Sequence, residues 1–271
     1  MPFTTSHPAI VLPLKQAFPR YFSLTGLMAG AMSPDLLYFL LLDTEHRGIS
    51  HSWLGLFTFC LPAGILFSFA FHRLFKYHVI LNLPRPVDRW LSGLAYSRFE
   101  INSLRKWSVL VISVLAGAIS HFFWDSFTHT EGEIARLFPI LIQESTILGI
   151  TRPICTFLQH LSTISGAILI LLYAAKSNLL PKPAFEEAVI NPKNKLLFWI
   201  SGLGIASIFA MVAVIFQGVY SGYYVDEFSR MTHIFKTFGL ASWAGFFYFA
   251  CAYSLIMKVR GIESELSDPF G

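Results

Sequence analysis

Long uninterrupted runs of apolar residues, separated by short polar segments, recur along the whole chain. A helix needs about 17 to 25 apolar residues to cross the hydrocarbon core of a bilayer. Runs of that length predict six membrane-spanning helices, over residues 22–42, 53–72, 107–127, 155–175, 196–219 and 236–257. The shorter apolar run 137–150 predicts an interfacial or re-entrant piece. The pattern therefore indicates an all-α fold, a polytopic membrane helix bundle.

The residues before the first apolar run predict a short amphipathic helix over residues 7–20. Pro8 suits the first turn of such a helix, and the residues around Pro19 offer a break before the first span. If this helix packs antiparallel to the first span, each rises by about 20 Å from the break. His7 would then return to the level of Asp35.

The amino-acid composition is that of a membrane protein and not that of a soluble domain. The 271 residues are 54% hydrophobic and 13% charged, whereas a soluble domain carries about 25% charged residues. The net charge of +4 gives no indication of a nucleic-acid partner, so membrane lipid is the expected partner, and the oligomeric state stays open. We expect one membrane-embedded helical domain over residues 1–271, with the polar candidates in 1–135 and mainly hydrophobic spans in 136–271.

The distribution of basic residues predicts an orientation. Cytoplasmic loops of membrane proteins carry an excess of Lys and Arg. Of the 20 Lys and Arg residues, the segments predicted to lie outside hold only Arg47, Arg136, Arg152, Arg230 and Lys236. We therefore expect an integral membrane protein with a cytoplasmic C-terminus. The side of the N-terminus stays open, because the first helix could fold back into the membrane.

Acidic and imidazole side chains interrupt the third apolar run at a helical spacing. His121, Asp125 and His129 are four residues apart, so on a helix they project from nearly the same face. Burying a carboxylate and two imidazoles in an apolar segment is costly unless they pair or bind a cation. Three such side chains on one face could supply half of the coordination shell of a metal ion.

Further candidates lie in and after the first run. Asp35 follows Pro34, which breaks a continuous helix, and could either point into a site or cap the helix that resumes. His46 and His51 follow in a segment that could also be a plain polar loop before an interfacial tryptophan. Because the first and third spans both run outward, these residues and those of the third run are expected at one level of the membrane, near its outer face.

The order of these motifs resembles a known group of proteins. A similarity to the bacterial inner-membrane family of metal-dependent hydrolases, of the LexA-binding type, rests on His7, Pro34-Asp35, His46-Arg47-Gly48-x-x-His51-Ser52 and His121-x-x-x-Asp125-x-x-Thr128-His129. An uncharacterised bacterial membrane family, a domain of unknown function, resembles more closely the opening Met-Pro-Phe-Thr-x-x-His-Pro-Ala and Phe71-His72-Arg73-Leu74. The all-helical zinc phospholipase C and nuclease group is distantly similar, although this chain lacks that group's second His-x-x-x-Glu helix.

The resemblance implies a metal site and a divalent metal ion as cofactor. The implied ligands are His7, Asp35, His46, His51, His121, Asp125 and His129. Zinc is the first candidate, and manganese or iron would suit the same ligand types. Arg47 could stabilise the charge of a phosphate, and Glu131 is a candidate general base.

The expected function is that of a membrane-embedded metal-dependent hydrolase. A bound metal ion turns a water molecule into a nucleophile at neutral pH. The expected substrate is a lipid-linked phosphate or another phosphoester, because such molecules lie within reach of the membrane surface. Two alternatives stay open. The cluster could be a structural polar or metal site in a protein without catalytic activity, or part of a small-solute or proton transporter.

Overall fold

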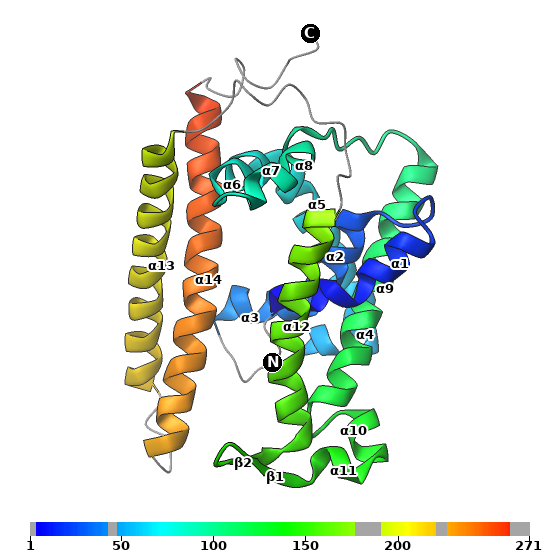
Figure 1. Cartoon of the computed structure of the whole chain (residues 1–271), viewed down its shortest axis with the longest axis vertical. Coiled ribbons are helices and arrows are strands. Elements are labelled where there is room, and N and C mark those ends of the chain that lie inside the picture. Colours follow the sequence, from blue (N-terminus) through cyan, green and yellow to red (C-terminus); the bar gives the residue numbers. More distant parts are fainter. Residues whose placement is uncertain (1–3, 43–47, 177–190, 221–226, 261–271) are drawn as a thin grey trace. The chain divides into compact units, whose positions relative to one another are not determined.

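Six helical segments of the protein are long and apolar enough to cross a membrane (Figure 1). The structure, a computed structural model, describes residues 4–42, 48–176, 191–220 and 227–260. The candidate spans are Leu24–Leu41, Trp53–Asn82, Leu104–Leu137, Ile154–Lys176, Pro192–Phe216 and His233–Val259. The predicted all-α class with about six spans is confirmed, as expected of an integral membrane protein.

The chain forms two compact units, each assembled from several segments. Residues 1–36, 48–68 and 100–176 make up the first unit, and residues 37–47, 69–99 and 177–271 make up the second. The expectation of one domain over the whole chain stays a prediction. All candidate ligands that the structure describes belong to the first unit.

The first unit holds the N-terminal helices, the third and fourth candidate spans, parts of the first two and a β-hairpin. Its elements are η1 (Thr4–Val11), α1 (Leu12–Ala17), α2 (Leu24–Met32), η2 (Ser33–Asp35), η3 (Ile49–His51), α4 (Trp53–Gly55), η4 (Leu56–Cys60), α5 (Leu61–Ala70, which continues into the second unit), α9 (Leu104–Thr128), α10 (Glu133–Leu137), α11 (Pro139–Ile142), β1 (Glu144–Ile147), β2 (Ile150–Pro153) and α12 (Ile154–Lys176). Of these, η1, η2 and η3 are 3₁₀ helices and η4 is a π-helix.

The helices α2 and α9 pack backbone against backbone, because small residues line their contact. A Cβ added at Gly30 would lie 2.1 Å from the carbonyl oxygen of Val114, and one added at Gly117 would lie 2.2 Å from that of Leu27. Small residues allow this close approach between helices in membranes, where packing and hydrogen bonds drive association. The contact places the C-terminal end of α2 directly beside the middle of α9.

The N-terminal segment is helical, but as two short pieces in place of the single helix predicted over residues 7–20. The first piece is the 3₁₀ helix η1, and the second, α1, ends at Ala17. Lys15 Nζ donates hydrogen bonds to the carbonyl oxygens of Pro19 and Phe22 and closes the turn that follows. The segment packs against α2, as expected, and also against α12.

The predicted interfacial piece at 137–150 consists of short helices and a hairpin. Strands β1 and β2 pair antiparallel, with Thr146 opposite Thr151 and Ile147 opposite Ile150. The two turn residues, Leu148 and Gly149, both have positive φ, at 52° and 79°. Such a two-residue turn matches the right-handed twist of the strands.

The second unit contains the two C-terminal spans and a group of short helices. Its elements are α3 (Leu36–Leu41), η5 (Phe71–Phe75, a π-helix), α6 (Lys76–Asn82), α7 (Val87–Trp90), α8 (Ser92–Tyr96), α13 (Pro192–Tyr220) and α14 (Glu227–Val259). Small residues again line a helix pair, with Ala210, Ala213 and Ala241 buried between α13 and α14. Lys195 at the start of α13 pairs with Asp88 of α7 and ties the short helices to this span.

The α2–α9 contact can be tested with one methyl group. We expect Gly117→Ala to lower the melting temperature of the detergent-purified protein, because overpacking costs about 1–3 kcal/mol. Gly204→Ala on α13 is the matched control, since a Cβ there meets nothing within 4 Å. It should leave stability unchanged or raise it, because Ala favours helix by about 1 kcal/mol over Gly. Equal melting temperatures of the two variants would contradict the proposed constraint.

Candidate metal centre

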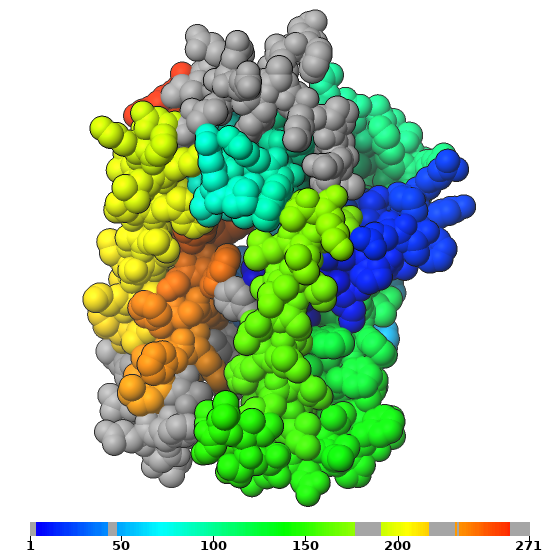
Figure 2. Space-filling view, viewed as in Figure 1, coloured from blue at the N-terminus to red at the C-terminus, as the bar shows by residue number. Residues whose placement is uncertain are grey.

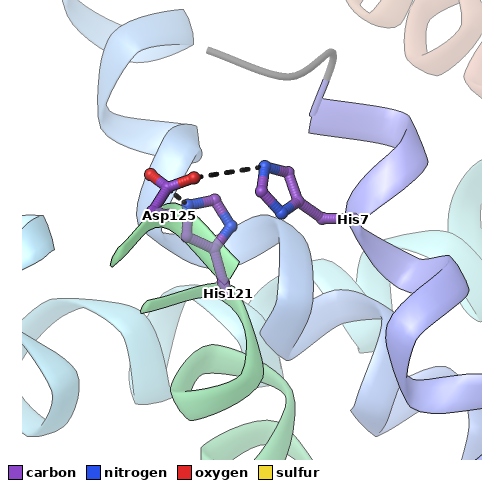
Figure 3. Close-up of side chains that lie close together, drawn as sticks. All are labelled: His7, His121 and Asp125. Atoms are coloured by element: carbon purple, nitrogen blue, oxygen red, sulfur yellow. Dashed lines mark ion pairs between the residues drawn. The ribbon is translucent and has the colours of Figure 1, made fainter. Parts of the chain in front are cut away.

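Five imidazole and carboxylate side chains from four elements of the first unit meet at one buried point. His7 comes from η1, Asp35 from η2 and His51 from η3, while His121 and Asp125 come from α9. Asp35 and His121 are 1% and 0% exposed, and Asp125 is 7% exposed. Figure 3 shows His7 and His121 facing the carboxylate of Asp125. The structure thus joins residues more than one hundred positions apart in sequence.

Two imidazole nitrogens and two carboxylate oxygens alternate in a ring of four atoms, here called the ligand ring. His121 Nε2 lies 3.6 Å from Asp35 Oδ1 and 3.4 Å from Asp125 Oδ2. His51 Nε2 lies 3.5 Å from Asp35 Oδ1 and 3.9 Å from Asp125 Oδ2. Charged hydrogen bonds are shorter, about 2.7–2.9 Å. Ligand atoms on a tetrahedral zinc ion are about 3.3–3.4 Å apart, because each lies about 2.0–2.1 Å from the metal.

The other oxygen of Asp125 faces a second group of nitrogens. Asp125 Oδ1 lies 3.8 Å from His7 Nε2 and 3.6 Å from His129 Nδ1. The His7 ring stacks on that of His121, with the ring centroids 3.9 Å apart. His7, His121 and Asp125 form a second set whose ligand atoms all lie within 4.8 Å of one another. Asp125 therefore stands between two sets of donors and offers one oxygen to each.

Several atoms of the cluster are buried without a hydrogen-bond partner in the part of the chain that the structure describes. These are His121 Nε2, Asp35 Oδ1, Asp125 Oδ1 and both ring nitrogens of His7. A buried polar atom left unsatisfied costs about 1–3 kcal/mol, and native interiors keep few of them. Their concentration at one point is the arrangement that a shared cation would satisfy.

Contacts outside the ring fix how its members point. His121 Nδ1 donates a hydrogen bond to the carbonyl oxygen of Ala31 at 2.8 Å, so in the neutral ring Nε2 keeps its lone pair. Thr4 Oγ1 donates to Asp35 Oδ2 at 2.7 Å and leaves Oδ1 facing the ring. Metal-binding histidines and carboxylates are held by the same kind of outer contact.

His7 is in the protonation state that a metal ligand requires. His7 precedes the first candidate span and is 4% exposed. Burial, with the nearby His121 as the next cause, lowers the pKa of His7 to about 3. At neutral pH its imidazole is therefore uncharged, which is the form that binds a metal ion.

The prediction that His121, Asp125 and His129 share one helical stripe is only partly right. Helix α9 ends at Thr128, and His129 follows with extended backbone. Its Nδ1 lies 3.1 Å from the carbonyl oxygen of Asp125, and its Nε2 lies 3.4 Å from Gln159 Nε2 of α12. The hydrogen bond to the carbonyl occupies Nδ1 and leaves Nε2 facing Gln159, and the side chain of His129 is 13% exposed, so His129 lies at the edge of the cluster.

Of the remaining candidates, the structure describes only Glu131, which does not join the cluster. Glu131 is exposed in the turn between α9 and α10, so its role as general base stays a prediction. His46 and Arg47 lie outside the described residues. Thr4 is the contributor that the sequence reasoning missed. A signal existed, because residues three apart, such as Thr4 and His7, share a face on a 3₁₀ helix and not only on an α-helix.

The bond from Thr4 to Asp35 gives a test of the outer contacts. We expect Thr4→Val to destabilise the protein by about 1–3 kcal/mol, because it leaves a buried carboxylate oxygen without its donor. Thr4→Ser retains the hydroxyl and should stay close to the wild type. Thermal unfolding of the three purified proteins measures the difference. A Val variant as stable as the Ser variant would show that this hydroxyl does not support Asp35.

The first 255 residues, which hold every side chain of the cluster, match a family profile. No curated protein and no solved structure matches the chain. The resemblance to metal-dependent hydrolases therefore stays a hypothesis, and any functional argument must come from the geometry of the cluster. The chain belongs to the family described as a domain of unknown function, DUF4184.

Proposed function

We propose that this protein is a membrane-embedded, metal-dependent hydrolase whose metal site is the ligand ring together with His7. The ligand ring carries the proposal, because its four ligand atoms belong to side chains that are at most 10% exposed and lie 3.4–3.9 Å apart around the ring. These spacings are too long for charged hydrogen bonds and close to those of a coordination shell. Two imidazoles and two carboxylates suit zinc in tetrahedral geometry, while manganese and iron accept the same ligand types.

The donors fit one ion well and could accommodate two. His51, His121, Asp35 and Asp125 would hold the first ion. His7 lies near Oδ1, the oxygen of Asp125 that is not part of the ligand ring. His7 and this oxygen would contribute to a second ion. A carboxylate shared in this way is a common feature of sites that bind two metal ions about 3.5–4 Å apart.

When bound, a divalent metal ion supplies a Lewis acid that polarises a water molecule and a phosphoryl oxygen. The residues of this chain hold the site in shape. Ala31 and Thr4 orient His121 and Asp35, and both of these side chains are shielded from bulk water, at 0% and 1% exposed. The side chains of Asp125 and His129, 10% and 13% exposed, form the edge where water and substrate would enter.

The proposed setting is a bacterial inner membrane with the C-terminus in the cytoplasm and the cluster toward the outer face. The excess of Lys and Arg in the inner segments supports this orientation. At that level a lipid-linked phosphate or a phospholipid headgroup would reach the site. A phosphoester is therefore the proposed substrate class, and membrane lipid the proposed surrounding partner.

Metal content is the first test. We expect elemental mass spectrometry of the detergent-purified protein to find zinc, manganese or iron in near-stoichiometric amount. The double variant His121→Ala/Asp125→Ala should lose it, because it removes two of the four ring donors. His160→Ala, at an exposed position of α12 in the same unit, is the control and should keep the metal. Metal-free wild-type protein with unchanged stability in chelator would overturn the proposal and leave a packing network or a proton path.

Hydrolysis is tested separately from metal binding. We expect the metal-loaded protein in lipid nanodiscs to release product from model phosphomonoesters or phosphodiesters. The Asp125→Asn variant should be slower by about 10–100-fold. Product formation per unit of bound metal is the measurement. Full metal occupancy without hydrolysis of any phosphoester would favour the alternative of a structural metal site.

A further inference from the structure

An apolar surface remains exposed where the chain passes from α9 to α12. Seven large apolar side chains of this connection are between 40% and 97% exposed. They are here called the tip patch, and they are Leu137, Phe138, Ile140, Ile142, Ile147, Leu148 and Ile150. Figure 2 shows this end of the first unit, in green, at the lower edge of the view. Exposed apolar patches of this kind mark contact sites for lipid or for other proteins.

The backbone of the hairpin singles out Leu148 within the patch. Its φ of 52° lies in the left-handed region, which disfavours a leucine and favours Gly or Asn. The side chain is 97% exposed and so gains no packing within the protein. Folding alone does not account for an apolar, γ-branched residue at this turn, whereas a nonpolar environment outside the protein does.

The position of the connection in the chain indicates what that environment is. Helix α9 has 25 residues and rises about 37 Å, which exceeds the roughly 30 Å thickness of a bilayer's hydrocarbon core. Helix α12 has 23 residues and is a candidate span as well. The connection joins two consecutive spans and therefore lies at a membrane surface. The tip patch is therefore adjacent to lipid.

The hairpin is shaped for shallow entry. Each strand has four residues and extends about 13 Å, far less than a membrane crossing. The turn residues and their neighbours, 146–151, carry no charge, and the charges of Glu144 and Arg152 stand at the open end. A two-stranded sheet leaves edge groups unpaired, and these would not be satisfied deep in hydrocarbon.

We infer that the β1–β2 hairpin and α11 insert the tip patch into the outer region of one bilayer leaflet, with Leu148 deepest among the acyl chains. The inserted hairpin holds the C-terminal end of α9 at the lipid surface. That end carries Asp125 and His129, so the anchor keeps the entrance of the cluster at the level of the lipid headgroups. The inference depends on the candidate spans and not on metal binding or hydrolysis.

Depth-dependent fluorescence quenching tests the insertion on the full chain. Cys60 and Cys155 are fully buried, so Cys251→Ala removes the one native thiol that is partly exposed. In that background Leu148→Cys carries the environment-sensitive dye NBD, and Glu144→Cys at the open end of the same hairpin is the control. The protein is reconstituted in vesicles of phosphatidylcholine and phosphatidylglycerol that contain nitroxide-labelled lipids.

We expect an acyl-chain nitroxide near the headgroup to quench the dye at residue 148 roughly twofold more strongly than at residue 144. A nitroxide at the end of the acyl chain should quench residue 148 less than the shallow one does. Equal quenching with water-like emission at both positions would overturn the inference. Blue-shifted emission at 148 without lipid quenching would also overturn it and would indicate a protein partner or a second copy.

A second variant separates insertion from folding of the turn. Asn is favoured at positive φ, so Leu148→Asn should preserve the hairpin while removing its apolar tip. With the dye at Ile150→Cys, we expect lipid quenching to fall when Leu148→Asn is added. Unchanged thermal unfolding of the pair would confirm that the fold is intact. Unchanged quenching in a folded variant would contradict the role of Leu148 as the anchor.

Discussion

The backbone contact between α2 and α9 is the constraint on which the rest of the first unit depends. At Gly30 and Gly117 the two helices approach so closely that a single methyl group would meet a carbonyl oxygen. One turn beyond Gly117 on α9, His121 reaches the carbonyl oxygen of Ala31. The spacing of the helices therefore sets both the position of the imidazole and the identity of the nitrogen that it presents to the cluster.

From this contact the cluster is assembled by changes in helix type. A Pro34-containing 3₁₀ turn follows α2 and aims Asp35 at α9, and a second 3₁₀ turn carries His51. A third, η1, offers Thr4 and His7 from one face, since residues three apart coincide in that helix. The ligand residues thus come from three 3₁₀ turns and from the regular helix α9.

The sequence predicted most of the fold and part of the cluster, for identifiable physical reasons. Apolar length alone located the six spans, because the bilayer thickness sets that length. The i, i+4 spacing located His121 and Asp125, since α9 is regular there. The end of α9 before His129 and the 3₁₀ form of η1 depend on tertiary contacts with α12 and α2, which local patterns do not record. The spacing of Thr4 and His7 was a local signal, but the partner of the Thr4 hydroxyl, Asp35, lies 31 positions further along the chain.

The N-terminal segment, which is synthesised first, packs against a helix that is synthesised much later. Ser6, next to His7, donates a hydrogen bond to the carbonyl oxygen of Thr163 at 2.8 Å, and its own carbonyl oxygen lies against Gly166. Residues 163 and 166 belong to α12, the fourth span to leave the ribosome. The surroundings of His7, the first histidine of the cluster to be synthesised, are therefore complete only after the fourth span has been made. Until α12 has entered the bilayer, the segment that carries Thr4 and His7 has α2 on one side but lacks α12 on the other.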